Sequence, residues 1–174
     1  WRDWSSDVCS SDLAETLFSD YRKQYKVETK IARIFNTYGP NMAVNDGRVV
    51  SNFIVQALKN EDLTIYGEGT QTRSFCFVSD LLDGLIKLFF KGYDGSPVNL
   101  GNPQEITIKQ LAEEIIGLTN SKSKILYLDL PEDDPVMRKP NIEKAIKLLG
   151  WSPKFDRKQG LSETISYFRN IILI

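Results

Sequence analysis

The chain has 174 residues, of which 22 are basic, 23 are acidic and none is histidine. The balanced charge gives no overall basic field that would draw the chain to nucleic acid, and the lack of histidine excludes Ser-His-Asp, Cys-His and histidine-metal chemistry within it. Two cysteines are too few for a disulfide framework or a zinc cluster, which favours a reducing cytoplasm, and no run of 18 apolar residues predicts a membrane span.

The first segment, residues 1–13, differs from the rest of the chain. The chain begins with Trp1, and Ser5-Ser6-Asp7 recurs as Ser10-Ser11-Asp12 within a polar run. We expect residues 1–13 to be foreign to the domain, or else a disordered native tail. Residues 14–174 are then expected to be a fragment of a larger protein.

A helix and a strand are expected next. Apolar side chains at helical spacing predict an amphipathic helix over residues 14–25, with Leu17, Phe18, Tyr21 and Tyr25 on one face. The nearly continuous apolar run in residues 28–35 favours a strand buried in a parallel sheet.

Loop residues 36–40 follow this strand. Ligands of α/β sheets bind beyond the carboxyl ends of strands, so the loop is a candidate site. A loop without function is the alternative.

The stretch from Leu63 to Asp80 predicts a hairpin. Two short apolar strands flank the turn Tyr66-Gly67-Glu68-Gly69, and Arg73 begins the second strand. A guanidinium at this place suits a phosphate or a carboxylate, because its planar donors match their oxygens in pairs. A solvated arginine on a surface hairpin is the alternative.

Further helices are expected at residues 48–60, 81–90, 107–118, 142–149 and 161–170, and strands at 97–101 and 124–130. Arg48 would lie at a helix N-terminus, which favours anions. Ser79 or Asp80 is expected to cap one helix and Thr107 another.

The acidic loop 132–135 lacks the spacing of a calcium site and is expected to be solvated. Cys76, inside an apolar strand, is expected to be buried and inert.

Five segments in this order and spacing resemble the C-terminal half of an extended short-chain dehydrogenase/reductase of the NAD-dependent epimerase/dehydratase family. The segment Asn45–Phe53 resembles the UDP-glucuronate decarboxylases of that family most closely. The other four segments are Arg33–Pro40, Tyr66–Asp80, Asn99–Pro103 and Arg138–Pro140.

The resemblance implies an α/β fold in which residues 14–174 supply late strands of a Rossmann-type sheet and a small mixed α/β substrate-binding lobe. It implies NAD as the cofactor, a UDP-sugar as the substrate, and a cytoplasmic homodimer. In the implied reaction, NAD oxidises C4 of UDP-glucuronate, CO2 is lost, and reduction of the ketone gives UDP-xylose. A nucleotide-sugar epimerase, a 4,6-dehydratase or a non-catalytic UDP-sugar-binding module are the alternatives.

The resemblance also assigns roles to single residues. Asn36 and Arg73 would hold the UDP diphosphate, and Arg138 would contact the UDP-glucuronate. Asn52 and Tyr66 would border the nucleotide, although both, like Asp80, could instead only shape the fold. Thr37 and Arg48 would line the cofactor side.

Two motifs of the family are missing. The string Gly67–Thr72 lacks the third glycine of a dinucleotide-binding turn and precedes a strand instead of a helix. The family's Tyr-x-x-x-Lys pair, in which the tyrosine serves as acid and base, aligns with Asp7 and Ser11. We therefore expect no catalytic residue in this chain, and neither tight NAD binding nor turnover by the chain alone.

Overall fold

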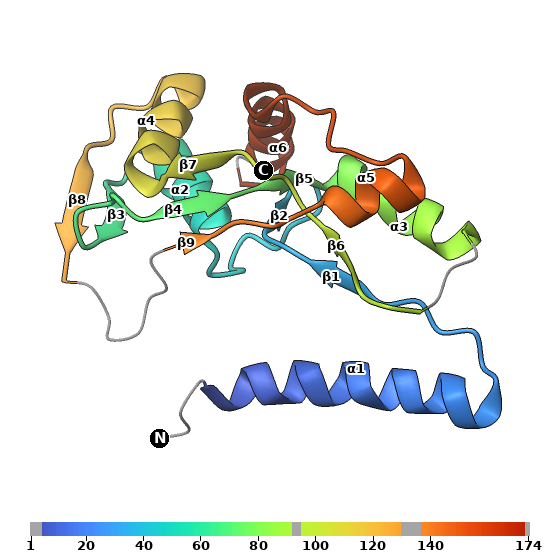
Figure 1. The fold of residues 1–174 in the computed structure, drawn as a ribbon. Helices are drawn as coiled ribbons and strands as arrows, with labels where there is room; N and C mark the ends of the chain where they lie inside the picture. Colours follow the sequence, from blue (N-terminus) through green and yellow to red (C-terminus); the bar gives the residue numbers. More distant parts are fainter. Residues whose placement is uncertain (1–4, 92–94, 130–136, 173–174) are drawn as a thin grey trace.

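The computed structural model describes residues 5–91, 95–129 and 137–172, which form a mixed α/β fold (Figure 1). Its helices are α1 (Ser5–Tyr25), α2 (Val49–Leu58), α3 (Val78–Phe90), α4 (Ile108–Thr119), α5 (Glu143–Leu149) and α6 (Arg157–Ile172). Its strands are β1 (Ala32–Ile34), β2 (Thr37–Tyr38), β3 (Leu63–Tyr66), β4 (Thr72–Ser74), β5 (Cys76–Phe77), β6 (Val98–Leu100), β7 (Glu105–Thr107), β8 (Ile125–Leu128) and β9 (Met137–Arg138). Within these ranges, no helix is long and apolar enough to cross a membrane.

The strands form short ladders that are mostly parallel. Strand β1 pairs with β6, β2 with β5 and β3 with β8, all in parallel, while β4 lies between antiparallel β7 and parallel β9. The parallel pairing of β1 is as expected, but the expected burial is wrong. Ile31 is buried, whereas Ile34 is 56% exposed. Within the described part of the chain, β1 pairs with β6, and the side of β1 that carries Ile34 is exposed.

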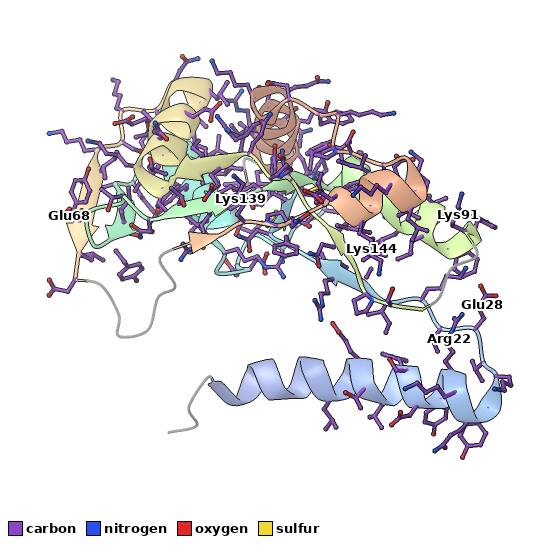
Figure 2. All side chains as sticks on the ribbon, viewed as in Figure 1. Arg22, Glu28, Glu68, Lys91, Lys139 and Lys144 are labelled. Atoms are coloured by element: carbon purple, nitrogen blue, oxygen red, sulfur yellow. The ribbon has the colours of Figure 1, made fainter. Side chains whose placement is uncertain are left out.

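Helix α1 starts at Ser5, nine residues before the expected Ala14. Figure 1 shows α1 running beside β1, set apart from the other helices. Its side chains Leu17, Phe18, Tyr21 and Tyr25 are each more than half exposed, so the apolar stripe expected from the sequence exists but does not pack into the core. Figure 2 shows Arg22 and Glu28 where α1 joins the rest of the chain.

The expected hairpin between residues 63 and 80 does not form. Strands β3 and β4 pair with other strands and not with each other, because the turn between them redirects the chain toward α4. The carbonyl of Gly69 accepts a hydrogen bond from the Lys109 amide at 3.0 Å, and that of Gln71 accepts one from the Ile108 amide at 3.1 Å. Gly67 and Gly69 have φ values of 68° and 71°, which glycine adopts without strain. The turn therefore receives the free N–H groups of the first turn of α4.

The two expected caps have different outcomes. Thr107 caps α4 through a capping box with Gln110, as expected. The expected cap at Ser79 or Asp80 is wrong, because α3 begins earlier and Phe77 occupies the cap position. Asp80 is instead buried in the first turn, where its carboxylate accepts a hydrogen bond from the Phe155 amide at 3.0 Å.

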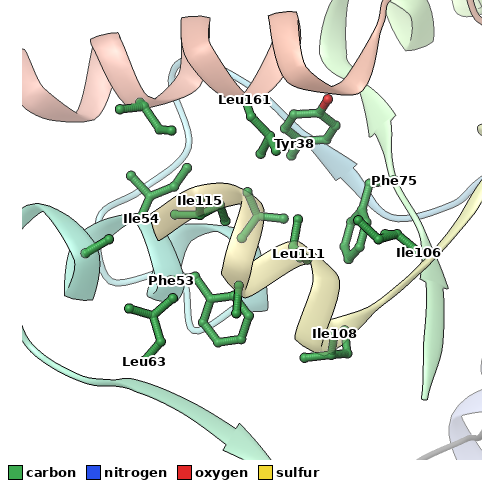
Figure 3. Close-up of a cluster of buried hydrophobic side chains, with 14 of the residues drawn as sticks. Tyr38, Phe53, Ile54, Leu63, Phe75, Ile106, Ile108, Leu111, Ile115 and Leu161 are labelled. Atoms are coloured by element: carbon green, nitrogen blue, oxygen red, sulfur yellow. The ribbon is translucent and has the colours of Figure 1, made fainter. Parts of the chain in front are cut away.

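The main core lies between α2, α4 and α6 and the strands beside them (Figure 3). Phe53, Leu111 and Leu161 bring one face of each helix into it, and Ile165 and Phe168 of α6 are also buried. A second cluster surrounds Trp151 between α3, α5 and β6. Burial at about 25 cal/mol per Å² of apolar area makes these two clusters the main stabilising term of the fold.

Candidate functional site

A cleft of about 680 Å³ opens where the strand ends and α2 meet. Five of the residues that the sequence singled out line it: Asn36, Thr37, Arg48, Tyr66 and Arg73. They come from four separate segments of the chain, which the fold brings together. The cleft floor is apolar and includes Phe35, Met42, Phe53, Ile65, Phe75 and Ile108. A polar rim over an apolar floor suits a ligand that has both a flat or apolar part and a charged part.

Arg73 supplies a buried positive charge to the cleft. It lies on β4 and is 9% exposed, and its Nη1 donates to the Thr72 carbonyl at 2.9 Å. Burial removes water from a charged group and makes its interaction with an anion stronger than at the surface. This arginine can therefore bind a phosphate or a carboxylate strongly.

The loop after β1 brings two polar side chains to the same cleft. The carbonyl of Asn36 accepts a hydrogen bond from the Cys76 amide at 2.8 Å, which fixes this residue against β5. The Thr37 hydroxyl donates to the Phe35 carbonyl at 2.9 Å, which tightens the same turn. Asn36 keeps part of its surface open to the cleft and so is available to a ligand.

Arg48 occupies the cap position of α2, at the positive end of the helix dipole. Its Nε lies 3.4 Å from an Asp46 carboxylate oxygen, and its side chain is 66% exposed. Asn52 does not line the cleft; its side-chain amide donates to the Gly47 carbonyl at 3.1 Å. That bond holds the loop at Gly47, whose φ is 77°, so the structure gives Asn52 a contact that shapes the fold.

Gln71 and Thr64 also line the cleft, and the sequence reasoning missed both. Gln71 donates from its amide to the Tyr66 carbonyl at 3.0 Å. Gln71 stands two residues before Arg73, and side chains two apart along an extended chain point the same way, which was an available signal. Thr64 stands two residues before Tyr66 in β3, so the same signal was available for it.

Arg138 is known from its backbone alone. In the parallel ladder of β4 and β9, its Cα is the partner of the Arg73 Cα. The following residue, Lys139, forms an ion pair with Glu105 at 3.4 Å. The acidic loop 132–135 lies outside the described residues.

Metal and thiol chemistry have no support in the described ranges. No group of three His, Cys, Asp or Glu side chains is placed there to hold a metal ion. Cys76 is fully buried, and burial, followed by the nearby Asp80 charge, raises the pKa of its thiol to about 12. The expectation that Cys76 is buried is confirmed.

Residues 10–101, more than half of the chain, match the sequence profile described as the NAD dependent epimerase/dehydratase family. The chain belongs to this family. It is 54% identical over 149 residues to UDP-glucuronic acid decarboxylase 3 of Arabidopsis thaliana, covering 86% of this chain and 43% of that protein. It is 55% identical over 157 residues to UDP-glucuronic acid decarboxylase 1 of Xenopus tropicalis, covering 90% of this chain and 37% of that protein.

Solved structures of the epimerase/dehydratase family share the fold. One is the UDP-glucuronic acid 4-epimerase of Bacillus cereus in complex with UDP-glucuronic acid and NAD, which is 26% identical with a TM-score of 0.83. The match covers 90% of this chain and 50% of that one. The Rossmann-type fold expected from the sequence is thereby confirmed, and this chain spans about half or less of the length of the relatives that it matches.

NAD is the cofactor of the epimerase/dehydratase family. Arg48 and the N-terminus of α2 bring positive charge to the cleft, which favours a phosphate. The turn at Gly67 and Gly69 leads into β4, and so it does not form the glycine-rich start of a helix that cradles the pyrophosphate of a dinucleotide.

Proposed function

We propose that this chain forms the nucleotide-sugar-binding half of an NAD-dependent enzyme that converts UDP-glucuronate to UDP-xylose and CO2. The observation that carries the proposal is the cleft that gathers Asn36, Arg48 and Arg73 from distant parts of the sequence. The identity of 54% to a plant UDP-glucuronic acid decarboxylase supports this particular reaction.

The chemistry of the substrate matches the cleft. UDP-glucuronate carries two phosphates and a carboxylate, and guanidinium groups bind such oxygens by paired, charge-assisted hydrogen bonds. Arg73 and Asn36 hold the diphosphate, and Arg138 contacts the sugar acid; the pairing of its Cα with that of Arg73 supports this assignment. Tyr66, which is half exposed at the rim, borders the nucleotide, and Asn52 supports the loop that carries Arg48.

The redox step belongs to the cofactor. NAD, when bound, accepts and returns the hydride at C4 of the sugar. Thr37 and Arg48, which both line the cleft, stand on the side toward it. Tyr38, next to Thr37, is no substitute for the family's acid and base. Burial raises the pKa of its hydroxyl, which donates to the Arg157 carbonyl.

An epimerase is the second candidate. The structural likeness to the UDP-glucuronic acid 4-epimerase of Bacillus cereus favours it, because that enzyme binds the same acid sugar. The lower identity of 26%, against 54% to the decarboxylase, ranks it second.

The domain boundary that we place after residue 13 is part of the same proposal. We place the family domain at residues 14–174 and treat residues 1–13 as standing where the family carries its tyrosine and lysine. The resemblance further supports a homodimer in the cytoplasm for the complete enzyme. The chain alone then binds UDP-sugars without turning them over.

Titration calorimetry of the 174-residue chain with UDP, UDP-xylose and uridine tests the binding step. We expect UDP and UDP-xylose to bind at least about tenfold more tightly than uridine, because uridine lacks the phosphates that Arg73 recognises. Equal affinities would contradict the assignment of the cleft. A chain rejoined to an upstream half with the tyrosine and lysine should release CO2 from UDP-glucuronate; formation of the C4 epimer without CO2 would favour the epimerase.

A further inference from the structure

An ion pair ties α1 to β1. Arg33 Nε and Nη2 donate to the two carboxylate oxygens of Glu15, each at 2.7 Å. The hydrogen bonds from Arg33 lower the pKa of the Glu15 carboxyl, which keeps it charged at neutral pH. Two parallel bonds of this kind fix orientation as well as distance.

This pair is a direct link between α1 and β1. The apolar side chains of the helix, Leu17, Phe18, Tyr21 and Tyr25, are 51–65% exposed and give little packing against the core. Arg22 donates to the Thr29 carbonyl, and the Thr29 hydroxyl donates to the Phe18 carbonyl. Those two bonds hold the helix end to the loop that follows it. The two hydrogen bonds from Arg33 come from β1 itself. They therefore fix the position of α1 along this strand.

The position of α1 along β1 decides which residues of the two elements lie level with each other. Helix α1 and strand β1 run in opposite directions (Figure 1). Four residues toward the start of a helix span about 6 Å, which is about two residues toward the end of a strand. From the contact at Glu15 and Arg33, position 11 of the helix therefore falls level with Phe35, which directly follows β1 and lines the cleft. Position 7 lies one helical turn further in the same direction. Positions 7, 11 and 15 recur every four residues and so share one face of α1.

We propose that the Glu15–Arg33 pair is the positioning link that sets the catalytic helix of the complete enzyme opposite the cleft. The proposal rests on the proposed function, in which positions 7 and 11 are those of the family's tyrosine and lysine. Glu15 and Arg33 touch neither substrate nor cofactor. They act by fixing the rotation of the helix and its position along β1, one turn away from the lysine position.

Hydrogen exchange of the 174-residue chain, followed by mass spectrometry, tests the structural half of this inference. We expect Glu15→Gln to speed amide exchange in residues 16–25 roughly two- to fivefold, the range of a partly exposed ion pair, and to leave α6 unchanged. Asp20→Asn is the matched control, because it removes an exposed carboxylate from the same helix. The reversed pair Glu15→Arg with Arg33→Glu should restore the slow exchange. Unchanged exchange in Glu15→Gln, or a reversed pair no better than its single variants, would overturn the inference.

A rejoined chain tests the catalytic half. Residues 1–13 are replaced by the upstream half of the Arabidopsis decarboxylase, and UDP-glucuronate turnover is measured with and without the substitution Glu15→Gln. We expect the substitution to lower kcat at least about threefold with KM unchanged, because the substrate is held by the cleft while the helix carries the acid and base. The reversed pair should recover kcat.

The outcomes of this second experiment separate the two proposals. A rise in KM with kcat unchanged, or no change in either, would overturn the positioning role. A rejoined chain that retains Glu15 and binds UDP yet releases no CO2 would instead count against the proposed function, and the exchange result would stand independently.

Discussion

Arg73 on β4 and Arg138 on β9 are partners in a parallel ladder, although 65 positions separate them in the sequence. Under the proposed function, the two positions serve one ligand with more than one negative group, a nucleoside diphosphate sugar that carries an acid.

Replacing Arg73 should weaken nucleotide binding even when its charge is kept. In Arg73→Lys the ammonium cannot reproduce the paired hydrogen bonds of the guanidinium, so we expect UDP affinity to fall about tenfold or more, or ~1.5–3 kcal/mol. Calorimetry measures the change. Arg169→Lys on the exposed side of α6 is the control and should bind UDP normally. Equal UDP affinity for the two variants would remove Arg73 from the site.

Asp80 should contribute to stability through its contacts with the segment that precedes α6. Its carboxylate accepts a hydrogen bond from the Phe155 amide, and its carbonyl accepts one from Trp151. Asp80→Ala leaves the Phe155 amide without its partner and should cost ~1–3 kcal/mol in urea unfolding. Asp83→Ala, which loses an exposed pair with Lys87, should cost only ~0.3–0.5 kcal/mol. A smaller loss for Asp80→Ala than for Asp83→Ala would contradict this reading of the contact.

Two helical glycines should respond in opposite directions to substitution by alanine. A Cβ on Gly160 would come within 2.5 Å of the Tyr38 hydroxyl and 2.8 Å of Phe77 Cδ2, so Gly160→Ala should lose ~1–3 kcal/mol of stability. A Cβ on Gly117 meets nothing within 4 Å. Gly117→Ala should therefore gain ~0.5–1 kcal/mol from better helix propensity. Thermal unfolding of both variants measures the difference, and a stabilised Gly160→Ala would show that α6 packs less closely on Tyr38.

The stability of the fold should decrease at alkaline pH. Burial raises the pKa of the Cys76 thiol from an ordinary value of 9.0 to about 12, so above pH 9 the unfolded chain loses this proton before the folded chain does. The folded state then binds more protons, and the free energy of unfolding falls as pH rises from about 9 to about 12. Cys76→Ala lowers stability overall but should show a shallower decline over this range. Parallel declines for the two proteins, measured by urea unfolding at several pH values, would rule out Cys76 as a contributor.

The local elements of the fold could be predicted, but their partners could not. Thr107 and Gln110 indicate the capping box of α4 within four residues, and the structure confirms it. The glycine turn after Tyr66 carries the same local pattern as a hairpin. Strand β3 nevertheless pairs with residues 125–128, some sixty positions away, a choice that depends on the packing of whole elements. Likewise, an apolar stripe such as that of α1 indicates a face to be covered but not what covers it.

The cleft could be predicted in part for the same reason. Asn36, Thr37, Arg48, Tyr66 and Arg73 stand at strand ends, turns and a helix start, which are the places where polar side chains reach ligands, and the structure brings them to one cleft. Asn52 lies one helical turn inside α2 and turns away to the Gly47 carbonyl. Gln71 and Thr64 stand two residues before Arg73 and Tyr66, so alternation along an extended chain was a signal for both. Their contacts with Tyr66 and Gln56 depend on the folded structure and could not be predicted from the sequence.

Phe75 is the single residue between β4 and β5, and these two strands belong to different ladders. On one side of it stands Ser74, next to Arg73, and on the other stands Cys76, whose amide holds the Asn36 carbonyl. A tilt of the ladder that carries Arg73 must therefore move Asn36 with it, since one residue of extended chain leaves almost no slack. A ligand bound to both would meet one rigid element with two contacts, and not two elements that adjust separately.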